Sequence, residues 1–236
     1  MKFVRGTIPG LDGERDIAVI EGDTHIGKWV EDEKRLDHDQ WMLPILAKYI
    51  TRDSVVYDVG ANIGDHTAFY ASLGPRAVVA FEAYADAFEC LCRNTLALRG
   101  VALCNVAVGD GCAISMAGDG PNKGARHLST RIDPLGGRSY KIDEMFGTLP
   151  PPTFIKLDIE GWEVRALRGA EETIRTLHPV IVCEVNRGAL ERAGNTPEEL
   201  HTILTGHGYR MIDLHGKPWE PGDARAHFDV IAEVKP

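Results

Sequence analysis

Short apolar runs alternate with helical periods along most of the chain, from Val55 onward. Apolar runs of about four to eight residues, bounded by turn residues, are typical of buried strands. Their alternation with helices is typical of an α/β domain built on a mainly parallel sheet. The runs predict strands at Val55–Val59, Ala77–Phe81, Ala102–Val106, Phe154–Leu157, Val180–Glu184, Tyr209–Asp213 and Phe228–Val234.

Apolar residues at helical spacing fill several gaps between these strands. Between the second and third strands they recur at intervals of three and four residues, and Gly100 supplies a C-terminal stop. A second apolar stripe follows the fourth strand, where Gly169 can divide it into two helical pieces. A third helix is expected to open at Pro197 and to run to Leu204, with Thr196 as its N-cap.

The first 54 residues are less regular than the rest. We expect short β elements at Phe3–Ile8 and Asp16–Glu21, followed by a helix leading into Pro44–Ile50. Residues 1–54 are therefore predicted to form a small N-terminal extension that acts as a partial lid on a domain at 55–236. The segment Gly109–Gly137 is rich in Gly, Asp, Asn and Pro, which predicts a partly ordered insertion over the sheet edge.

Composition narrows the class of protein. The 236 residues suit one large domain. With 26 Lys and Arg against 35 Asp and Glu, the net charge is -9 and no basic run is present, so we expect no nucleic-acid partner. The five cysteines lack metal-site spacing and are interpreted as reduced thiols of a cytoplasmic protein. No stretch predicts a signal peptide or a membrane span.

A glycine-rich turn follows the first core strand in the sequence DVGANIG, and Asp58 stands at the strand's end. A dinucleotide would bring its pyrophosphate to such a turn, where Asp58 would repel it. The spacing D-x-G-x-x-x-G also departs from the dehydrogenase pattern G-x-G-x-x-G. S-adenosylmethionine carries no phosphate, and its sulfonium and ammonium groups are attracted by a carboxylate. An ordinary strand-to-helix turn is the alternative interpretation of the glycine motif alone.

Glu82 strengthens the cofactor interpretation. It ends the second core strand, 24 residues after Asp58, where a carboxylate can accept both ribose hydroxyls. The third strand leads into Asn105–Val108, whose backbone, with the side chain of Asp110, is placed to frame the adenine. The predicted S-adenosylmethionine site comprises Asp58, Gly60, Ala61, Asn62, Gly64, Glu82, Ala83, Asn105 and Ala107.

A second constellation follows the fourth and fifth strands. The segment KLDIEGWE carries Asp158, Glu160 and Glu163, and VIVCEVN carries Glu184 and Asn186. Together with the DVGANIG turn and the FEA stretch, these segments resemble the FkbM-type family of S-adenosylmethionine-dependent methyltransferases, from about residue 37 to residue 186. The resemblance implies a seven-stranded, Rossmann-like class I methyltransferase sheet, mostly parallel with the last strand antiparallel. It also implies methylation of a hydroxyl on a sugar, glycan or natural product.

Methyl transfer from a sulfonium is an in-line displacement, and a carboxylate or imidazole can take the acceptor proton. Asp158 is the first candidate, because in the methyltransferase sheet its strand lies next to the first; a helix N-cap is the alternative. Glu184 and His66 are further catalytic candidates, although a lone helical histidine is usually solvated or simply hydrogen-bonded. Glu163 is expected to complement the helix dipole.

Acceptor contacts are expected from a polar and aromatic cluster ahead of the core and from the second constellation. Trp29 and Trp41 could instead anchor the N-terminal helix by burying area. Asp158, Glu184 and Asn186 offer the oxygen ligands that magnesium prefers, but their spacing does not demand convergence and we expect no metal. The predicted acceptor residues are Trp29, His38, Asp39, Trp41, Glu160 and Asn186.

The sequence thus predicts an S-adenosylmethionine-dependent O-methyltransferase with a small-molecule or carbohydrate acceptor. An N-methyltransferase on a small amine remains open, because nothing shows or excludes a pocket that deprotonates an ammonium. A noncatalytic S-adenosylmethionine or glycan binding module would keep Asp58 and Glu82 but would have no use for Asp158. A dinucleotide oxidoreductase is disfavoured by the glycine spacing and by Asp58.

Overall fold

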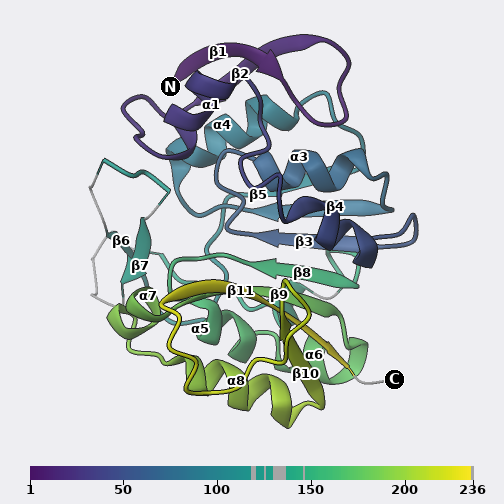
Figure 1. Ribbon diagram of the computed structural model, residues 1–236, viewed down its shortest axis with the longest axis vertical. Helices are drawn as coiled ribbons and strands as arrows, with labels where there is room; N and C mark the ends of the chain where they lie inside the picture. The colour runs from purple at the N-terminus through teal and green to yellow at the C-terminus, as the bar shows by residue number, and fades with distance from the viewer. Residues whose placement is uncertain (118–120, 125, 130–136, 146, 235–236) are drawn as a thin grey trace. The chain divides into compact units, whose positions relative to one another are not determined.

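The computed structural model describes residues 1–117, 121–124, 126–129, 137–145 and 147–234. These residues form a seven-stranded sheet in the order β10-β11-β9-β8-β3-β4-β5 (Figure 1). The last strand, β11, runs antiparallel to both of its neighbours, as predicted. The strands are β3 (Val55–Val59), β4 (Ala77–Phe81), β5 (Val101–Cys104), β8 (Phe154–Leu157), β9 (Val180–Asn186), β10 (Tyr209–Asp213) and β11 (His227–Val234).

Two strand ends differ from the predicted ones. β5 stops at Cys104 rather than at Val106, and Asn105 turns so that its Nδ2 donates to the carbonyl of Glu82 at 2.7 Å. β9 continues beyond Glu184, because its antiparallel pairing with β11 extends to the pair His227 and Asn186. As a result, Asn105 lies outside β5, whereas Asn186 lies inside β9.

Helices connect the strands much as the apolar stripes indicate. Gly169 ends α5, and a Cβ added there would lie 1.9 Å from the carbonyl oxygen of Gly109, so this position requires glycine. Thr196 and Glu199 form a capping box at the start of α8. The helices are α1 (Ile26–Glu33), α2 (Leu43–Leu46), α3 (Asp65–Ser72), α4 (Ala85–Thr95), α5 (Glu163–Arg168), α6 (Glu171–Leu177), α7 (Arg187–Arg192) and α8 (Pro197–Gly206), with 3-10 turns η1 (Ala47–Tyr49) and η2 (Ile142–Met145).

Internal contacts divide the chain into two compact units. The first contains Met1–Val106 and the described residues of 118–126. In it, the antiparallel hairpin of β1 (Lys2–Thr7) and β2 (Glu14–Val19) packs against α4 (Figure 1). Asn94 of α4 fastens this hairpin, because its amide bonds both the N–H and the carbonyl of Ala18 and also the carbonyl of Ile63.

The second unit contains residues 107–117 and the described residues from 127 onward. Helix α8 lies beside α5 at the outer side of this unit (Figure 1). Within the expected insertion at 109–137, β6 (Ser115–Ala117) and β7 (His127–Ser129) form a two-stranded ribbon. The rest of that expectation falls partly on residues 118–120, 125 and 130–136, which lie outside the described residues. Among the described residues, every helix is too short or too polar to cross a bilayer.

Candidate functional site

The glycine turn after β3 is held by backbone hydrogen bonds. The N–H groups of Gly60 and Ala61 both donate to the carbonyl of Phe81, at 2.9 and 3.0 Å. Gly60 and Asn62 have φ of 88° and 48°, in the left-handed region. Gly64 also has positive φ, and a Cβ there would lie 2.8 Å from Cδ1 of Leu91 in α4. Gly64 therefore permits close packing against α4.

Asp58 lies at the end of β3 and is only 1% exposed. Its Oδ2 accepts a 2.5 Å hydrogen bond from the hydroxyl of Thr67 in α3. A buried carboxylate needs such partners, because an unpaired charge inside a protein is costly. The side chain thus ties the strand end to the helix that follows the glycine turn.

Glu82 connects the glycine turn to the start of α4. Its Oε2 accepts from the N–H of Asn62 at 2.8 Å, and its Oε1 accepts from the N–H of Tyr84 at 2.7 Å. Each oxygen of a carboxylate can accept more than one hydrogen bond. The guanidinium of Arg126 stacks over the Tyr84 ring, 3.4 Å from its centroid.

Ala107 and Asp110, which follow β5, make hydrogen bonds to different parts of the second unit. Ala107 is buried, and its carbonyl accepts from the N–H of Tyr140 at 2.8 Å. The carboxylate of Asp110 pairs with Arg165 at 2.7 Å and accepts from the N–H of Cys112. The expectation that Asp110 helps to frame the adenine stays a prediction.

In the second unit, Asp158 follows β8 directly and pairs with Lys156, whose Nζ lies 2.6 Å from Oδ2. Lys156 is buried, while the Asp158 side chain is 35% exposed. The N-cap position of α5 belongs to Trp162, so the interpretation of Asp158 as a cap of this helix is wrong. The pair presents an accessible carboxylate beside a buried cation.

Glu184 of β9 pairs with His227 of β11, and Oε1 and Nε2 lie 2.6 Å apart. This hydrogen bond raises the pKa of His227 to about 9. Glu184 is 8% exposed, and its Oε2 is buried with no hydrogen-bond partner among the described residues. Burial, and then the charge of Asp158, raise the pKa of Glu184.

The turn between Asp158 and α5 brings two further carboxyl groups to this region. Glu160 has φ of 55°, and burial followed by the charges of Glu184 and Asp158 raises its pKa to about 7. Gly161 follows with φ of 104°, and a Cβ there would lie 2.2 Å from the carbonyl oxygen of Ala189. The backbone of this turn therefore has little freedom.

Glu163 stands in the first turn of α5, but it is not the charged dipole partner expected from the sequence. Its carboxyl group is buried, and Oε1 accepts from the N–H groups of Ile159 and Gly161 at 2.9 and 3.2 Å. Burial raises the pKa of Glu163 to about 8, so the group is mostly neutral at pH 7. In this structure Glu163 stabilises the turn between β8 and α5 through these two hydrogen bonds.

Asn186 is the N-cap of α7. Its Oδ1 accepts from the N–H of Ala189 at 3.1 Å. The amide oxygen is therefore used by the helix, which leaves its Nδ2 group as a donor.

The N-terminal polar cluster surrounds His66. Its Nε2 lies 3.2 Å from Oδ2 of Asp39 and its Nδ1 lies 3.3 Å from the hydroxyl of Tyr70. His66 is buried and makes hydrogen-bond contacts, which agrees with the hydrogen-bonded alternative and not with the solvated one. The ring of His38 makes edge contacts with Trp29, which packs on the core of the hairpin. Trp41 is 58% exposed and does not anchor by burial, contrary to that expectation.

Sequence reasoning missed Lys156 and His227 as site residues. Lys156 lies inside a strand that reads as apolar, and His227 precedes the strand predicted at Phe228. Lys156 could have been found, because residues two apart in a strand lie on the same face, which places Lys156 beside Asp158. Nothing local in the sequence indicates the partner of His227.

Comparison with known proteins decides the family. The model of the methyltransferase FkbM domain matches residues 58–211. The chain belongs to the FkbM methyltransferase family. The protein is therefore an S-adenosylmethionine-dependent methyltransferase, with S-adenosylmethionine as the methyl donor. The hexuronic acid methyltransferase AglP of Haloferax volcanii is 29% identical over 179 residues, which are 71% of this chain and 68% of that protein.

Solved structures agree in fold. The crystal structure of methyltransferase FkbM from Methylobacillus flagellatus KT matches with a TM-score of 0.52 and 18% identity. This match covers 76% of the present chain but only 44% of the other, so the chain spans less than half of that FkbM protein. Precorrin-6y C5,15-methyltransferase from Geobacter metallireducens GS-15 has a TM-score of 0.52 and 14% identity, with 93% and 94% of the two chains covered.

Proposed function

We propose that this FkbM-family enzyme is an O-methyltransferase that acts on a hydroxyl of a sugar, glycan or sugar-bearing natural product. The observation that carries the proposal is Asp158, an accessible carboxylate kept beside the buried ammonium of Lys156 at the end of a core strand. The name of the relative from Haloferax volcanii, a hexuronic acid methyltransferase, supports a carbohydrate acceptor.

Asp158 serves as the general base in this proposal. The nearby ammonium of Lys156, 2.6 Å away, favours the ionised carboxylate. As the acceptor oxygen attacks the methyl carbon, the new C–O bond forms and the C–S bond breaks. The hydroxyl proton passes to the carboxylate, and the sulfonium becomes a neutral sulfide. A positioned base of this kind contributes about 100-fold or more to a rate.

Glu184 and Glu160 hold the remaining hydroxyls of the acceptor. The Oε2 atom of Glu184 is buried without a partner, so a ligand hydroxyl would satisfy it. Glu160 has a pKa of about 7, so it can donate or accept a hydrogen bond near neutral pH. Asn186 contributes its Nδ2 group as a donor. A sugar ring suits this set of acceptors and donors, because each of its hydroxyls can both donate and accept a hydrogen bond.

The cofactor is assigned to the glycine turn and the strand ends around it. Glu82 would bind the two ribose hydroxyls, because each oxygen of a carboxylate can accept more than one hydrogen bond. Asp58 supplies the negative charge that attracts a cationic ligand. The full proposed set is Asp58, Gly60, Ala61, Asn62, Gly64, Glu82, Ala83, Asn105 and Ala107.

Residues 1–54 are proposed to act as a partial lid ahead of the methyltransferase domain at 55–236. Trp41 is an exposed aromatic of this segment and offers a face on which a sugar ring can stack. Trp29, His38 and Asp39 complete the proposed lid contacts, and buried His66 is proposed to hold Asp39 in place. We also propose a cytoplasmic location, which the five free cysteines support.

Transfer of a labelled methyl group tests this function. The full chain is incubated with labelled S-adenosylmethionine and separate pools of nucleotide sugars, glycans and small amines. Label is expected in a carbohydrate pool, and transfer by the Asp158→Asn variant is expected to fall about 100-fold or more. Glu191→Gln, on the exposed side of α7, is the matched control and should retain activity.

Calorimetry with S-adenosylmethionine completes the test. Asp158→Asn should bind the cofactor as the unmodified enzyme does. Label only in the amine pool would favour the N-methyltransferase. Full cofactor binding with no transfer to any pool would favour the noncatalytic binding module.

A further inference from the structure

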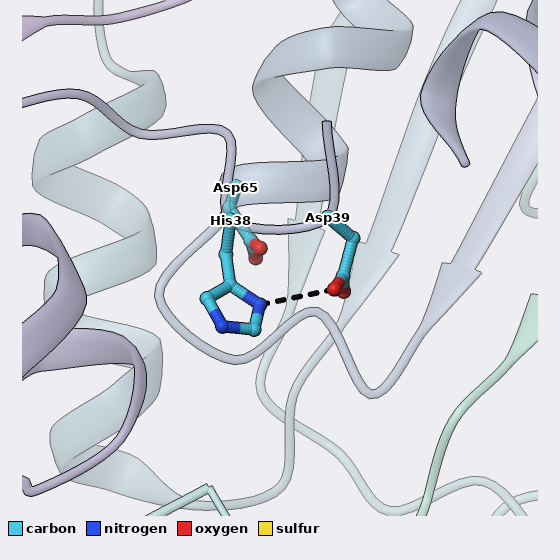
Figure 2. A group of neighbouring side chains, drawn as sticks. All are labelled: His38, Asp39 and Asp65. Carbon is cyan, nitrogen blue, oxygen red and sulfur yellow. Dashed lines mark ion pairs between the residues drawn. The ribbon is translucent and has the colours of Figure 1, made fainter. Parts of the chain in front are cut away.

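Four ionisable residues in two adjacent pairs meet at the start of α3. The pairs are His38 with Asp39, ahead of the core, and Asp65 with His66, directly after the glycine turn. Donor atoms of His38, Asp39 and Asp65 all lie within 4.8 Å of one another, and Figure 2 shows the three side chains pointing toward a common point. In the part of the chain that the structure describes, no other group of three such residues is this close.

Asp65 is the side chain that ordinary packing does not explain. It is 4% exposed and its carboxylate accepts no hydrogen bond from the described residues, although it lies in the first turn of α3 and its charge acts on His38. Asp65 is the first residue of α3, yet it does not cap the helix, because the N-cap is Gly64 and makes no side-chain bond. A buried carboxylate that accepts no hydrogen bond is unfavourable, although the N-terminal end of a helix favours negative charge. A cation bound at this point would remove that cost.

The spacing of the donors fits one ion. Metal–donor bonds of about 2.1 Å place two donors of the same ion about 3 to 4 Å apart. Nδ1 of His38 and Oδ1 of Asp39 are already 3.1 Å apart, and the donor atoms of all three residues lie within 4.8 Å of one another. One imidazole and two carboxylates form a donor set suited to zinc or manganese rather than to soft or purely oxygen-seeking ions.

We propose that His38, Asp39 and Asp65 bind a divalent transition-metal ion, with zinc as the reference case. His66 acts as an outer partner, because its Nε2 lies 3.2 Å from Oδ2 of Asp39 and orients that carboxylate. Three protein donors leave positions on the ion for water or for a ligand oxygen. The ion lies beside the glycine turn, which Asp65 follows directly.

A simpler network of His–Asp hydrogen bonds is the competing explanation. It accounts for Asp39, because, against the effect of burial, hydrogen bonds from His38 and His66 hold the pKa of Asp39 well below its usual range. It does not account for Asp65, which takes no part in those bonds. The two explanations therefore differ in what they predict for Asp65.

Metal binding can be measured without the methyltransferase reaction. The full chain is treated with a chelator, dialysed, and titrated with Zn²⁺ by calorimetry and with Co²⁺ by visible absorption. We expect one ion per chain, Co²⁺ bands typical of nitrogen and oxygen donors, and a higher melting temperature with Zn²⁺. Because no methyl transfer is measured, failure of the proposed O-methylation would leave this result unaffected.

Variants locate the ion. Asp65→Asn and His38→Gln should each lower Zn²⁺ affinity at least about 10-fold. Asp86→Asn removes the same charge from the first turn of α4, and should bind Zn²⁺ within about twofold of the unmodified chain. Circular dichroism checks that each variant is folded, and the two ligand variants are independent of each other. The proposal is overturned if the unmodified chain binds no ion, or if binding survives both ligand variants.

Discussion

Nε2 of His227 lies 2.6 Å from Oε1 of Glu184, across the neighbouring strands β11 and β9. The hydrogen bond to Glu184 raises the pKa of His227 to about 9, so the imidazole is protonated at neutral pH. The folded protein therefore holds this proton more tightly than the unfolded chain does. The resulting contribution to stability is complete below about pH 6.5 and is lost as the pH rises through 9.

Glu184→Gln should return the His227 pKa toward the ordinary value of about 6.5, because the carboxylate that stabilises the imidazolium is gone. NMR titration of the His227 ring measures this directly. An equal His227 pKa in both proteins would show that the pair does not form in solution.

Glu163→Gln should remove part of the pH dependence of stability. The folded protein holds the Glu163 proton to about pH 8, whereas the unfolded chain releases it near pH 4.5. Stability therefore falls between these values as the pH rises. Glutamine cannot lose a proton and keeps the oxygen that accepts from Ile159 and Gly161. Urea unfolding at pH 5, 7 and 9 should show that the free energy of unfolding of the variant rises relative to that of the unmodified chain as the pH rises. An equal difference between the two proteins at all three pH values would refute this account of Glu163.

Gly161→Ala should be strongly destabilising, by about 3 kcal/mol or more, or should prevent folding. The residue combines φ of 104° with a carbonyl oxygen 2.2 Å from the new Cβ. Gly194→Ala is the matched control, because Gly194 has φ of 75° and no atom within 4 Å of the added Cβ. The control should lose only about 1 kcal/mol. Similar melting temperatures for the two variants would contradict the tight turn described here.

Local patterns in the sequence were sufficient to predict the main elements of the fold. The apolar run at Val55–Val59, the break at Gly169 and the cap at Thr196 each rest on a property of a few adjacent residues, and the structure confirms all three. The end of β5 was not predictable in this way, because Val106 is as apolar as the strand before it. The hydrogen bond from Asn105 to the Glu82 carbonyl, a contact distant in sequence, turns the chain away earlier.

Candidate site residues could be predicted from the sequence where a carboxylate lies at the end of a predicted strand. Asp58, Glu82 and Asp158 all follow or end predicted strands, and their positions in the structure agree with this. Partners brought by tertiary pairing were not predictable. His227 reaches Glu184 only through the register of two antiparallel strands, and Asp65 meets His38 only after the N-terminal segment folds back. Burial, which sets the pKa of Glu163, is likewise a property of the folded chain.

The position of the transferred methyl group tests the central claim most directly. The enzyme is supplied with S-adenosylmethionine that carries a ¹³C-labelled methyl group and with the carbohydrate pool that accepts label. Long-range carbon–proton NMR correlations then identify the atom to which the methyl is bonded. We predict a methyl ether on a sugar oxygen, with the correlation to a ring proton. A methyl group on nitrogen, or none on any carbohydrate, would contradict the account.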